Sequence, residues 1–475
     1  MHRRIQKLLV GLVITGAFGG AMPASAPASS LVNGETRNET STGAIADARQ
    51  AGTAIDIREI LDAARGVAPA LCVLATDGAL TVGRWGGGWG SDVPAAPIAT
   101  DVRAGVRKVL RSELSASETR ALLDGLGAQD ACVRFLAAAL IGRDHDDAVV
   151  DDLVERLRGQ QAMERQGAAL ALGLIGSKKA IDPLIRALRD NAMEVRANAA
   201  WALGRSDAKR AGSAILPLVR DNADAVRFAA IEALGHIHET PSVEELLRIL
   251  RDDTSPEVRR VAAWALGQLG SRAAVEGLGA ALRSDKSNEV REMCAWALGE
   301  LGSRDSVDPL LNALRSEESA NVRETAAWAL GELDANEALD ALSEVAGSDR
   351  SSDVRATAAW AVGTIHPRKA PRTLVKALND SNDDVRFKAA WALSQIADPD
   401  AVPAVTSALK AEQRDNVRQA LVRALLESGE RSEDALKDML RSNDADTREM
   451  AVKALAGRRG PWPWPWPWPR PRPFP

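Results

Sequence analysis

Apolar and polar positions follow one another along this chain in a pattern that predicts pairs of short helices. Residues 242–250 carry apolar side chains at helical spacing, which predicts a first helix. A second helix is expected directly after it, because Ser255 is a typical N-cap residue and proline, here Pro256, is favoured at the first helical position. Its end is expected near Gly267 and Gly270.

The same unit recurs along most of the chain. Each second helix contains a repeated arginine, usually after valine, and these arginines are 30 to 32 residues apart without a break. A fixed period of this length is typical of stacked helix-turn-helix units. We therefore expect an all-α fold, a right-handed α-α superhelix of about 11–12 repeats over residues 99–457. The repeated arginines are Arg103, Arg134, Arg165, Arg196, Arg227, Arg259, Arg291, Arg323, Arg355, Arg386, Arg418 and Arg448.

The repeated sequence resembles the HEAT family, specifically its short type first described in phycobilisome lyases. The resemblance rests on the unit D…VR..AAWALG.LG and on the preceding …PL..ALRD, as in residues 182–190. It covers about three quarters of the chain. The resemblance implies a superhelix whose concave surface is lined by the second helices. It leaves the function open, because the family includes scaffolds, enzymes and adaptors.

The repeated arginine falls within the apolar stripe of its helix, where a charged group needs a partner. An aspartate stands six residues before half of these twelve arginines. We expect an internal ladder in which each guanidinium bridges aspartates of its own or the neighbouring turn, and an anion-binding row is the alternative. The expected ladder contains Arg196, Arg227, Arg259, Arg291, Arg323, Arg355 and Arg386 with Asp190, Asp221, Asp253, Asp285, Asp349 and Asp380.

A second repeated position, five residues after the arginine, is tryptophan in six units. On a helical wheel it lies roughly 175° from the centre of the apolar face, which predicts an aromatic ladder exposed on the concave surface. Exposed aromatic rows are typical of binding sites. The alternative is that the indoles pack on each other or on the next repeat. The predicted binding residues are Trp201, Trp264, Trp296, Trp328, Trp360 and Trp391, with Gln268, Glu300, Glu332 and Gln395 four residues further on.

The two ends of the chain differ from the repeats. Residues 1–28 combine a basic start with an apolar stretch and small residues before Ser29, which predicts an export signal and a periplasmic or secreted protein. The alternative is an uncleaved membrane anchor. Residues 29–98 are expected to be a flexible segment with one or two helices and a loop rich in Gly and Trp. Residues 458–475 alternate Pro with Trp and Arg, which predicts a disordered or polyproline II tail.

The composition narrows the classes of function. The chain has 60 basic and 65 acidic residues, a balance that argues against a nucleic-acid binder. No catalytic constellation can be assembled from the sequence, and we expect no enzyme activity and no cofactor. Glu232, His236 and His238 have a poor spacing for a metal site on one helix face. Of the three cysteines, Cys72 and Cys132 could pair after export, whereas Cys294 replaces a core alanine.

These observations favour a non-enzymatic scaffold that binds an extended protein or peptide along the concave tryptophan-lined surface. A partner rich in Pro and Arg fits such a surface, because aromatic grooves bind polyproline rods and arginine stacks on indoles. The chain's own tail is one such segment, and contact of the tail with a membrane is a weaker alternative. A carbohydrate-binding solenoid is the main rival, since sugar rings also stack on aromatic rows. A bilin lyase or isomerase and a HEAT-type nucleic-acid glycosylase are further rivals.

Overall fold

The computed structural model describes residues 57–58, 61, 114–143, 147–206, 208–237 and 243–428, with isolated positions between 437 and 452. Every described residue belongs to the compact unit of residues 55–475. The expected export signal and tail lie outside the described residues, so the domain boundaries stay predictions. Among the described residues, no helix is both long and apolar enough to cross a membrane.

Ten helix pairs follow one another in residues 114–428, and the expectation of an all-α solenoid is confirmed. The first helices of the pairs are α6 (Ala116–Gly125), α8 (Val150–Arg156), α10 (Ile181–Ala187), α12 (Gly212–Ile215), α14 (Val243–Asp252), α16 (Val275–Ser284), α18 (Val307–Ser316), α20 (Leu339–Ser348), α22 (Arg372–Lys376) and α24 (Val402–Ala411). The second helices are α7 (Ala131–Arg143), α9 (Ala162–Ile175), α11 (Met193–Arg205), α13 (Asp224–Ile237), α15 (Pro256–Leu269), α17 (Asn288–Glu300), α19 (Ala320–Glu332), α21 (Ser352–Ile365), α23 (Asp383–Ile396) and α25 (Asp415–Glu427).

Short 3₁₀ helices accompany most of the first helices. They tighten the turn that leads from one repeat to the next, or complete a short first helix. Their bounds are η1 (Asp147–Val149), η2 (Lys178–Ala180), η3 (Lys209–Ala211), η4 (Leu216–Arg220), η5 (Arg272–Ala274), η6 (Arg304–Ser306), η7 (Asn336–Ala338), η8 (Ala377–Asn379) and η9 (Pro399–Ala401).

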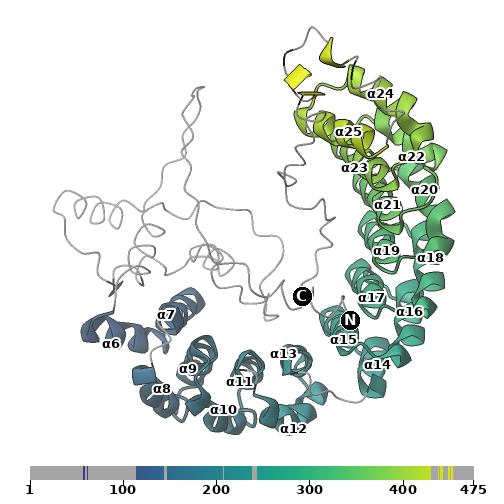
Figure 1. Cartoon of the computed structure of the whole chain (residues 1–475). Helices are drawn as coiled ribbons and strands as arrows, with labels where there is room; N and C mark the ends of the chain where they lie inside the picture. Colours follow the sequence, from purple (N-terminus) through teal and green to yellow (C-terminus); the bar gives the residue numbers. More distant parts are fainter. Residues whose placement is uncertain are drawn as a thin grey trace, which may run out of the picture. The chain divides into compact units, whose positions relative to one another are not determined.

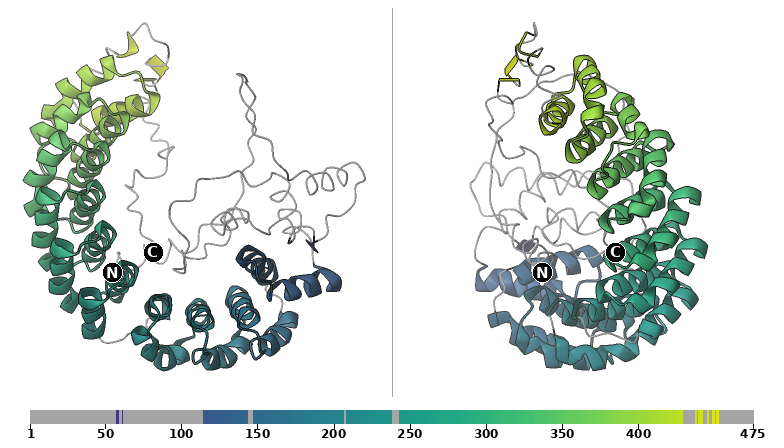
Figure 2. Two further views of the ribbon diagram at one scale, coloured as in Figure 1. Left: turned by 180° about the vertical axis from the view of Figure 1, so that it is seen from behind. Right: turned by 45° about the vertical axis from the view of Figure 1, so that its right-hand side comes forward.

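The helices form two rows in a curved array. From α7 to α25 the odd-numbered helices form the inner row, and the even-numbered helices from α8 to α24 form the outer row (Figures 1 and 2). Each inner helix from α9 to α23 packs against the inner helices of both neighbouring repeats and against the outer helix of its own repeat. Among the described helices, none covers the remaining face of the inner helices, as expected for the second helices of such an array.

The local signals at α15 match the expected helix ends. The Ser255 hydroxyl accepts the N–H of Val258 at 3.4 Å, and Pro256 is the first helical residue. The helix ends at Gly270, whose φ of 65° favours glycine because it lies in the left-handed region. Gly267 lies two residues before the last helical residue, Leu269, so the expected end near Gly267 and Gly270 is confirmed.

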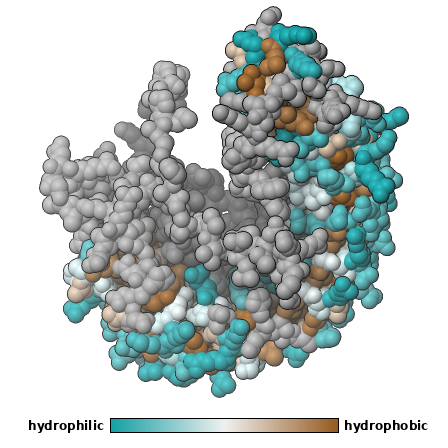
Figure 3. Space-filling view, viewed as in Figure 1, coloured by the Kyte–Doolittle hydropathy of each residue, from teal (hydrophilic) through white to brown (hydrophobic). Residues whose placement is uncertain are grey.

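The core runs continuously through the repeats. In α15, Val258, Ala262, Ala263 and Leu266 are fully buried, as the apolar stripe predicts. Fully burying a side chain such as leucine contributes about 1.5–3 kcal/mol, and each repeat supplies several such residues. Polar side chains cover much of the outer row, as the hydrophilic rim in Figure 3 shows.

Candidate functional site

The repeated arginines form an ion-pair ladder that connects consecutive repeats. In each described step from Arg165 to Arg386, the guanidinium donates two hydrogen bonds to a carboxylate of the following repeat. The closest N–O distances of the eight pairs are 2.6–2.9 Å. The expected pairing with the neighbouring turn is therefore present. The pairs are Arg165–Asp190, Arg196–Asp221, Arg227–Asp253, Arg259–Asp285, Arg291–Glu317, Arg323–Asp349, Arg355–Asp380 and Arg386–Glu412.

Each arginine also contacts its own repeat, but through the main chain. Arg259 donates from Nη1 to the carbonyl of Asp253, six residues earlier, at 2.9 Å. The carboxylate partner, Asp285, in turn accepts the N–H of Ser287 at 2.9 Å and so orders the turn before α17. One ion pair thus ties together two repeats and the loop that starts the next inner helix. These contacts agree with a structural role for the ladder.

Two ladder members, Glu317 and Glu412, were missing from the expected set, which contained only aspartates. They occupy the same place, six residues before Arg323 and Arg418, and the longer side chain still reaches the arginine of the preceding repeat. The hydrogen bond from Arg291 holds the pKa of Glu317 below its usual value. The six-residue offset was the signal that could have found them.

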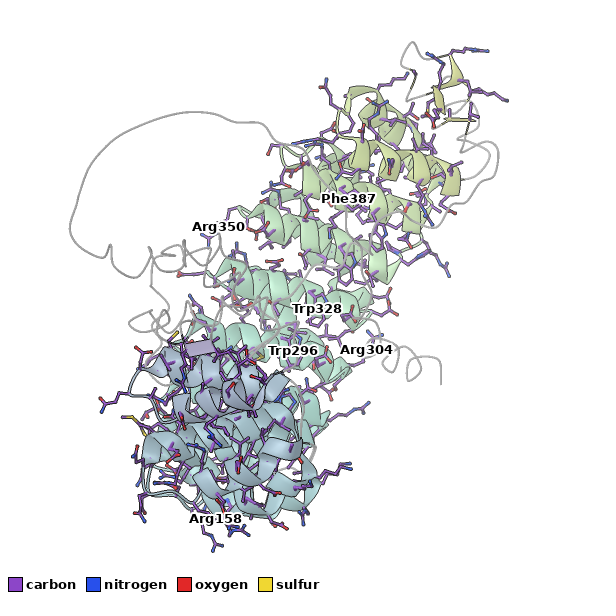
Figure 4. All side chains as sticks on the ribbon, turned by 90° about the vertical axis from the view of Figure 1, so that its left-hand side faces the viewer. Arg158, Trp296, Arg304, Trp328, Arg350 and Phe387 are labelled. Carbon is purple, nitrogen blue, oxygen red and sulfur yellow. The ribbon has the colours of Figure 1, made fainter. Side chains whose placement is uncertain are left out.

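The expectation that the tryptophans are exposed is wrong. All six indoles are buried, with only 3–7% of each residue exposed. Figure 4 shows Trp296 and Trp328 on neighbouring inner helices, between Arg350 near one edge and Arg304 near the other. The wheel placed them correctly relative to the outer helix, but it took no account of the inner helices on either side. The tryptophans that are buried, contrary to the expectation, are Trp201, Trp264, Trp296, Trp328, Trp360 and Trp391.

The place of each indole is set by a glycine in the preceding repeat. In every case the Cζ3 edge lies against a glycine eight residues after the repeated arginine, where a Cβ would be only 2.5–3.2 Å from it. The absent side chain therefore makes room for the ring. The pairs are Trp201–Gly173, Trp264–Gly235, Trp296–Gly267, Trp328–Gly299, Trp360–Gly331 and Trp391–Gly363. The tryptophans connect repeats by packing.

The residues four positions beyond the tryptophans do reach the surface. Gln268 and Glu332 are exposed, while Glu300 and Gln395 are half-buried. The same face of the inner helices carries further acids at positions two before and one after the repeated arginine. From α15 to α21 these positions hold seven acids, which we call the acidic inner face: Glu257, Glu289, Glu292, Glu300, Glu324, Glu332 and Asp353.

The acids of this face are accessible and charged. Glu257, Glu289, Glu332 and Asp353 are exposed, and the others are half-buried. A hydrogen bond from the Ser287 hydroxyl holds the pKa of Glu289 below its usual value, with a smaller contribution from neighbouring arginines. Only Glu300 and Glu332 of the seven are expected from the sequence, since they follow the tryptophans by four residues, whereas the other five follow no tryptophan at that spacing.

Within the run of inner helices from α11 to α23, one helix lacks the tryptophan. Helix α13 has Glu232 in the tryptophan register, and this carboxylic side chain is buried, with 5% of the residue exposed. Among the described residues, its Oε2 atom has no hydrogen-bond partner. Burial raises the pKa of Glu232 to about 7, although Arg205 and Arg260 partly offset the effect. Nearby, the ring of His236 lies 5.1 Å from that of Trp264.

The cysteines and the weak metal motif can also be placed in part. Cys132 on α7 is disulfide-bonded, and Cys72 lies outside the described residues. Cys294 is a free, buried thiol on α17. Glu232 and His236 share α13, whereas His238 lies outside the part of the chain that the structure describes. Within that part, no group of three or more His, Cys, Asp or Glu residues could hold a metal ion.

Comparisons with solved structures give similar solenoids at low sequence identity. A structure of importin beta has a TM-score of 0.53 and 13% identity, and the match covers 88% of this chain and 65% of importin beta. The Kap95:Nup1 complex contains a chain with a TM-score of 0.49 and 13% identity, at 88% and 65% coverage. An engineered protein has a TM-score of 0.38 and 22% identity, at 74% and 97% coverage. The chain therefore spans less than two thirds of the importin beta sequence.

Among curated proteins, none matches the sequence significantly. The sequence profile of the family described as HEAT repeats, however, matches in seven overlapping segments: 119–204, 150–235, 181–267, 212–286, 243–331, 275–363 and 346–426. These segments together extend from residue 119 to residue 426, more than half of the chain, and include every described inner helix from α9 to α23. The protein therefore belongs to the HEAT-repeat family.

Proposed function

We propose that this protein is a non-enzymatic scaffold that binds an extended, basic segment of a partner protein along the acidic inner face. The observation that carries the proposal is the charge of that face. From α15 to α21 it holds seven acids and one base, Arg260, a difference of −6, whereas the whole chain has 60 basic and 65 acidic residues, a difference of −5. Negative charge is thus concentrated on a few helices.

The dimensions of this face suit an extended segment. Packed helices are about 8–10 Å apart, so α15 to α21 span roughly 30 Å. An extended chain covers about 3.3 Å per residue, so about nine residues would cross all four helices. Complementary charge raises the association rate and selects among partners more than it raises affinity, which fits a scaffold with exchangeable partners.

The buried tryptophans count against the carbohydrate-binding alternative. Stacking on a sugar ring needs an accessible aromatic face, and the six indoles are 3–7% exposed. The acids also count against nucleic acid, whose phosphates require basic side chains. A bilin lyase or isomerase gains no support, since no feature of the described inner face suggests a chromophore site.

The tail of the chain offers a natural probe for this proposal. Residues 458–475 contain four arginines and no acidic residue, but they lie outside the described residues. We use their sequence as a basic, proline-rich peptide and leave open whether the physiological partner is the tail or another protein. If unrelated basic peptides bind with equal affinity, the acidic inner face recognises basic segments of other proteins and not the tail in particular.

The test is titration calorimetry of the full chain with the 458–475 peptide and with a peptide in which its arginines are glutamines. We expect binding of the first only, with an affinity that falls as salt rises. The triple variant Glu257→Gln, Glu289→Gln, Asp353→Asn should weaken it at least tenfold. These acids lie in the first turns of α15, α17 and α21.

Glu276→Gln, Asp308→Asn, Asp340→Asn is the matched control, because these acids lie in the first turns of the outer helices α16, α18 and α20. Both triple variants remove three charges and three favourable interactions with helix N-termini. Equal loss of binding in the two variants would show that only net charge matters, and the proposal for the inner face would be lost.

We also propose that the protein is exported, as residues 1–28 predict. The disulfide bond of Cys132 supports this proposal, because disulfides persist in oxidising compartments. Expression of the full chain in a bacterial host, followed by fractionation and N-terminal sequencing, tests it. A mature protein that begins at Ser29 outside the cytoplasm is expected, and an intact cytoplasmic chain would contradict export.

A further inference from the structure

The interruption of the tryptophan row at α13 is a feature that scaffold function alone does not require. Gly204, in the preceding repeat, lies where the other units place a glycine under an indole, yet its nearest neighbour is Ala233. The side chain that replaces the indole is the carboxyl group of Glu232, which is almost fully buried. A polar group in such a place costs free energy unless a hydrogen bond or protonation compensates.

Two aromatic contacts flank this carboxyl group on the inner row. On α11, the guanidinium of Arg205 lies over Trp201, with Cζ 5.3 Å from the ring centroid. On the other side, His236 of α13 contacts Trp264 of α15. Arg205 is exposed to solvent. It is also one of the two cations close enough to act on Glu232.

The remaining charged groups around α13 are already engaged or lie at other positions. Arg260 on α15 is the second cation that acts on Glu232, and it also acts on Glu289. Helix α12 has no charged residue, and on η4 the single one, Arg220, pairs with Glu245. On the three inner helices α11, α13 and α15, each ladder arginine binds a carboxylate: Arg196, Arg227 and Arg259. The acids in the first turns of these helices are Glu194, Asp224 and Glu257.

We propose that Glu232 is a proton-operated switch in the inner row. When protonated, its neutral carboxyl group occupies the tryptophan register. When ionised, it draws the guanidinium of Arg205 away from Trp201 and forms an ion pair between α11 and α13. The proton leaves to solvent, and no covalent bond changes. The switch exchanges a cation–π contact for an interhelical ion pair at one joint of the array.

The position of Glu232 gives this exchange a working range near neutral pH. An isolated glutamic acid is ionised throughout that range, but burial raises the pKa of Glu232 to about 7. The ratio of protonated to ionised carboxyl therefore changes tenfold per pH unit around neutrality. The inference does not depend on any binding partner.

The experiment is a titration of tryptophan fluorescence in the full chain from pH 5 to pH 9. It uses the His236→Gln variant, so that titration of the imidazole beside Trp264 does not contribute. We expect one transition with a midpoint near 7, caused by the changed surroundings of Trp201. The transition should vanish on addition of Glu232→Gln, which keeps the shape of the side chain but does not titrate.

Two further variants identify the moving groups. Addition of Trp201→Phe should remove the fluorescence change, and addition of Arg205→Gln should remove it too, because the cation over the indole is then absent. Circular dichroism establishes that each variant folds, and Glu232→Met serves as a second non-titrating variant. The proposal is overturned by a flat titration in the folded His236→Gln protein, or by a transition that persists without Glu232 or without Arg205.

Discussion

The Cζ3 atom of Trp264 occupies the space beside Gly235 that any other residue would fill with its side chain. A Cβ at Gly235 would lie 2.5 Å from this atom, closer than real Cβ contacts come. The indole of one repeat is therefore matched to a glycine of the repeat before it, and the same match recurs along the inner row. This relationship leads to a direct prediction about stability.

We expect Gly235→Ala to destabilise the protein by about 1–3 kcal/mol, because the ring or the backbone must shift to admit the methyl group. Alanine's better helix propensity, about 1 kcal/mol, offsets only part of this cost. The control is Gly347→Ala in α20, where the nearest atom to a new Cβ is 3.4 Å away. Thermal unfolding should show a lower midpoint for the first variant and an unchanged or higher one for the second.

Loss of an arginine should destabilise the protein much more in the buried ladder than in an exposed ion pair. The side chains of Arg323 and Asp349 are 6% and 9% exposed, whereas those of Arg251 and Asp252 are 74% and 49% exposed. Arg323→Ala leaves a buried carboxylate without its partner and should cost about 3 kcal/mol. Arg251→Ala should cost less than about 1 kcal/mol. Similar unfolding midpoints for the two variants would contradict a structural role for the ladder.

The buried carboxyl group of Glu232 should make the folded protein less stable as the pH rises from 4.5 to about 7. Its pKa is about 7 in the folded protein against 4.5 ordinarily, so the folded state binds the proton more tightly. The stabilising effect of that proton is fully present below pH 4.5 and is lost as the pH rises through 7. This pKa shift corresponds to about 3 kcal/mol in the free energy of unfolding. Thermal unfolding of Glu232→Gln should lack this decline, and parallel curves for variant and wild type would contradict the assignment.

The ladder carboxylates predict the opposite pH dependence, in acid. Burial alone would raise the pKa of Asp285, but hydrogen bonds from Arg259 and from the N–H of Ser287 outweigh it and hold the pKa below 3.8. The ionised Asp285 carboxylate contributes its full stabilisation of the folded state above pH 3.8. This stabilisation is lost as the pH falls through the lower pKa of the folded protein. Asp285→Asn should therefore lower the unfolding midpoint at pH 6 more than at pH 2, which calorimetry can measure.

Cys294 is expected to be inert in the folded protein. It is fully buried, and burial raises the pKa of its thiol far above the ordinary value, so almost no reactive thiolate forms. Iodoacetamide at pH 8 should leave this residue unmodified in the native protein and modify it in denaturant, as followed by peptide mass spectrometry. Rapid native modification would show that α17 opens locally.

The sequence was sufficient to predict the ladder but not the surroundings of the tryptophans. A charge in an apolar stripe requires a partner, and the acid at a constant six-residue offset indicated an ion-pair ladder. The offset left open whether Arg259 binds the carboxylate of Asp253 in its own turn or that of Asp285 in the neighbouring one, and the structure shows Asp285. Trp264 gave no such signal, because a helical wheel describes one helix and its outer neighbour. In a solenoid an inner helix also has inner neighbours, and these bury the flank on which the indole lies.

A second signal for the tryptophans was present but was interpreted differently. Gly267 is expected near the end of its helix, and it does lie two residues before the end of α15, but it also receives the edge of Trp296. A glycine at a constant interior position of a helix indicates close approach of another group. Glu232 could not have been recognised as a buried acid, because burial of the tryptophan register had not been predicted.

The ladder also bears on how the length of this protein can change. Each repeat from α10–α11 to α22–α23 contributes one arginine that pairs with a carboxylate of the following repeat, and one carboxylate that pairs with the arginine of the preceding repeat. Removal of residues 254–285 would still leave Asp253 to receive Arg227, and Arg291 to bind Glu317. Whole repeats can therefore be duplicated or lost while every arginine of the ladder keeps a carboxylate partner. The number of repeats can vary in evolution without an unpaired charge.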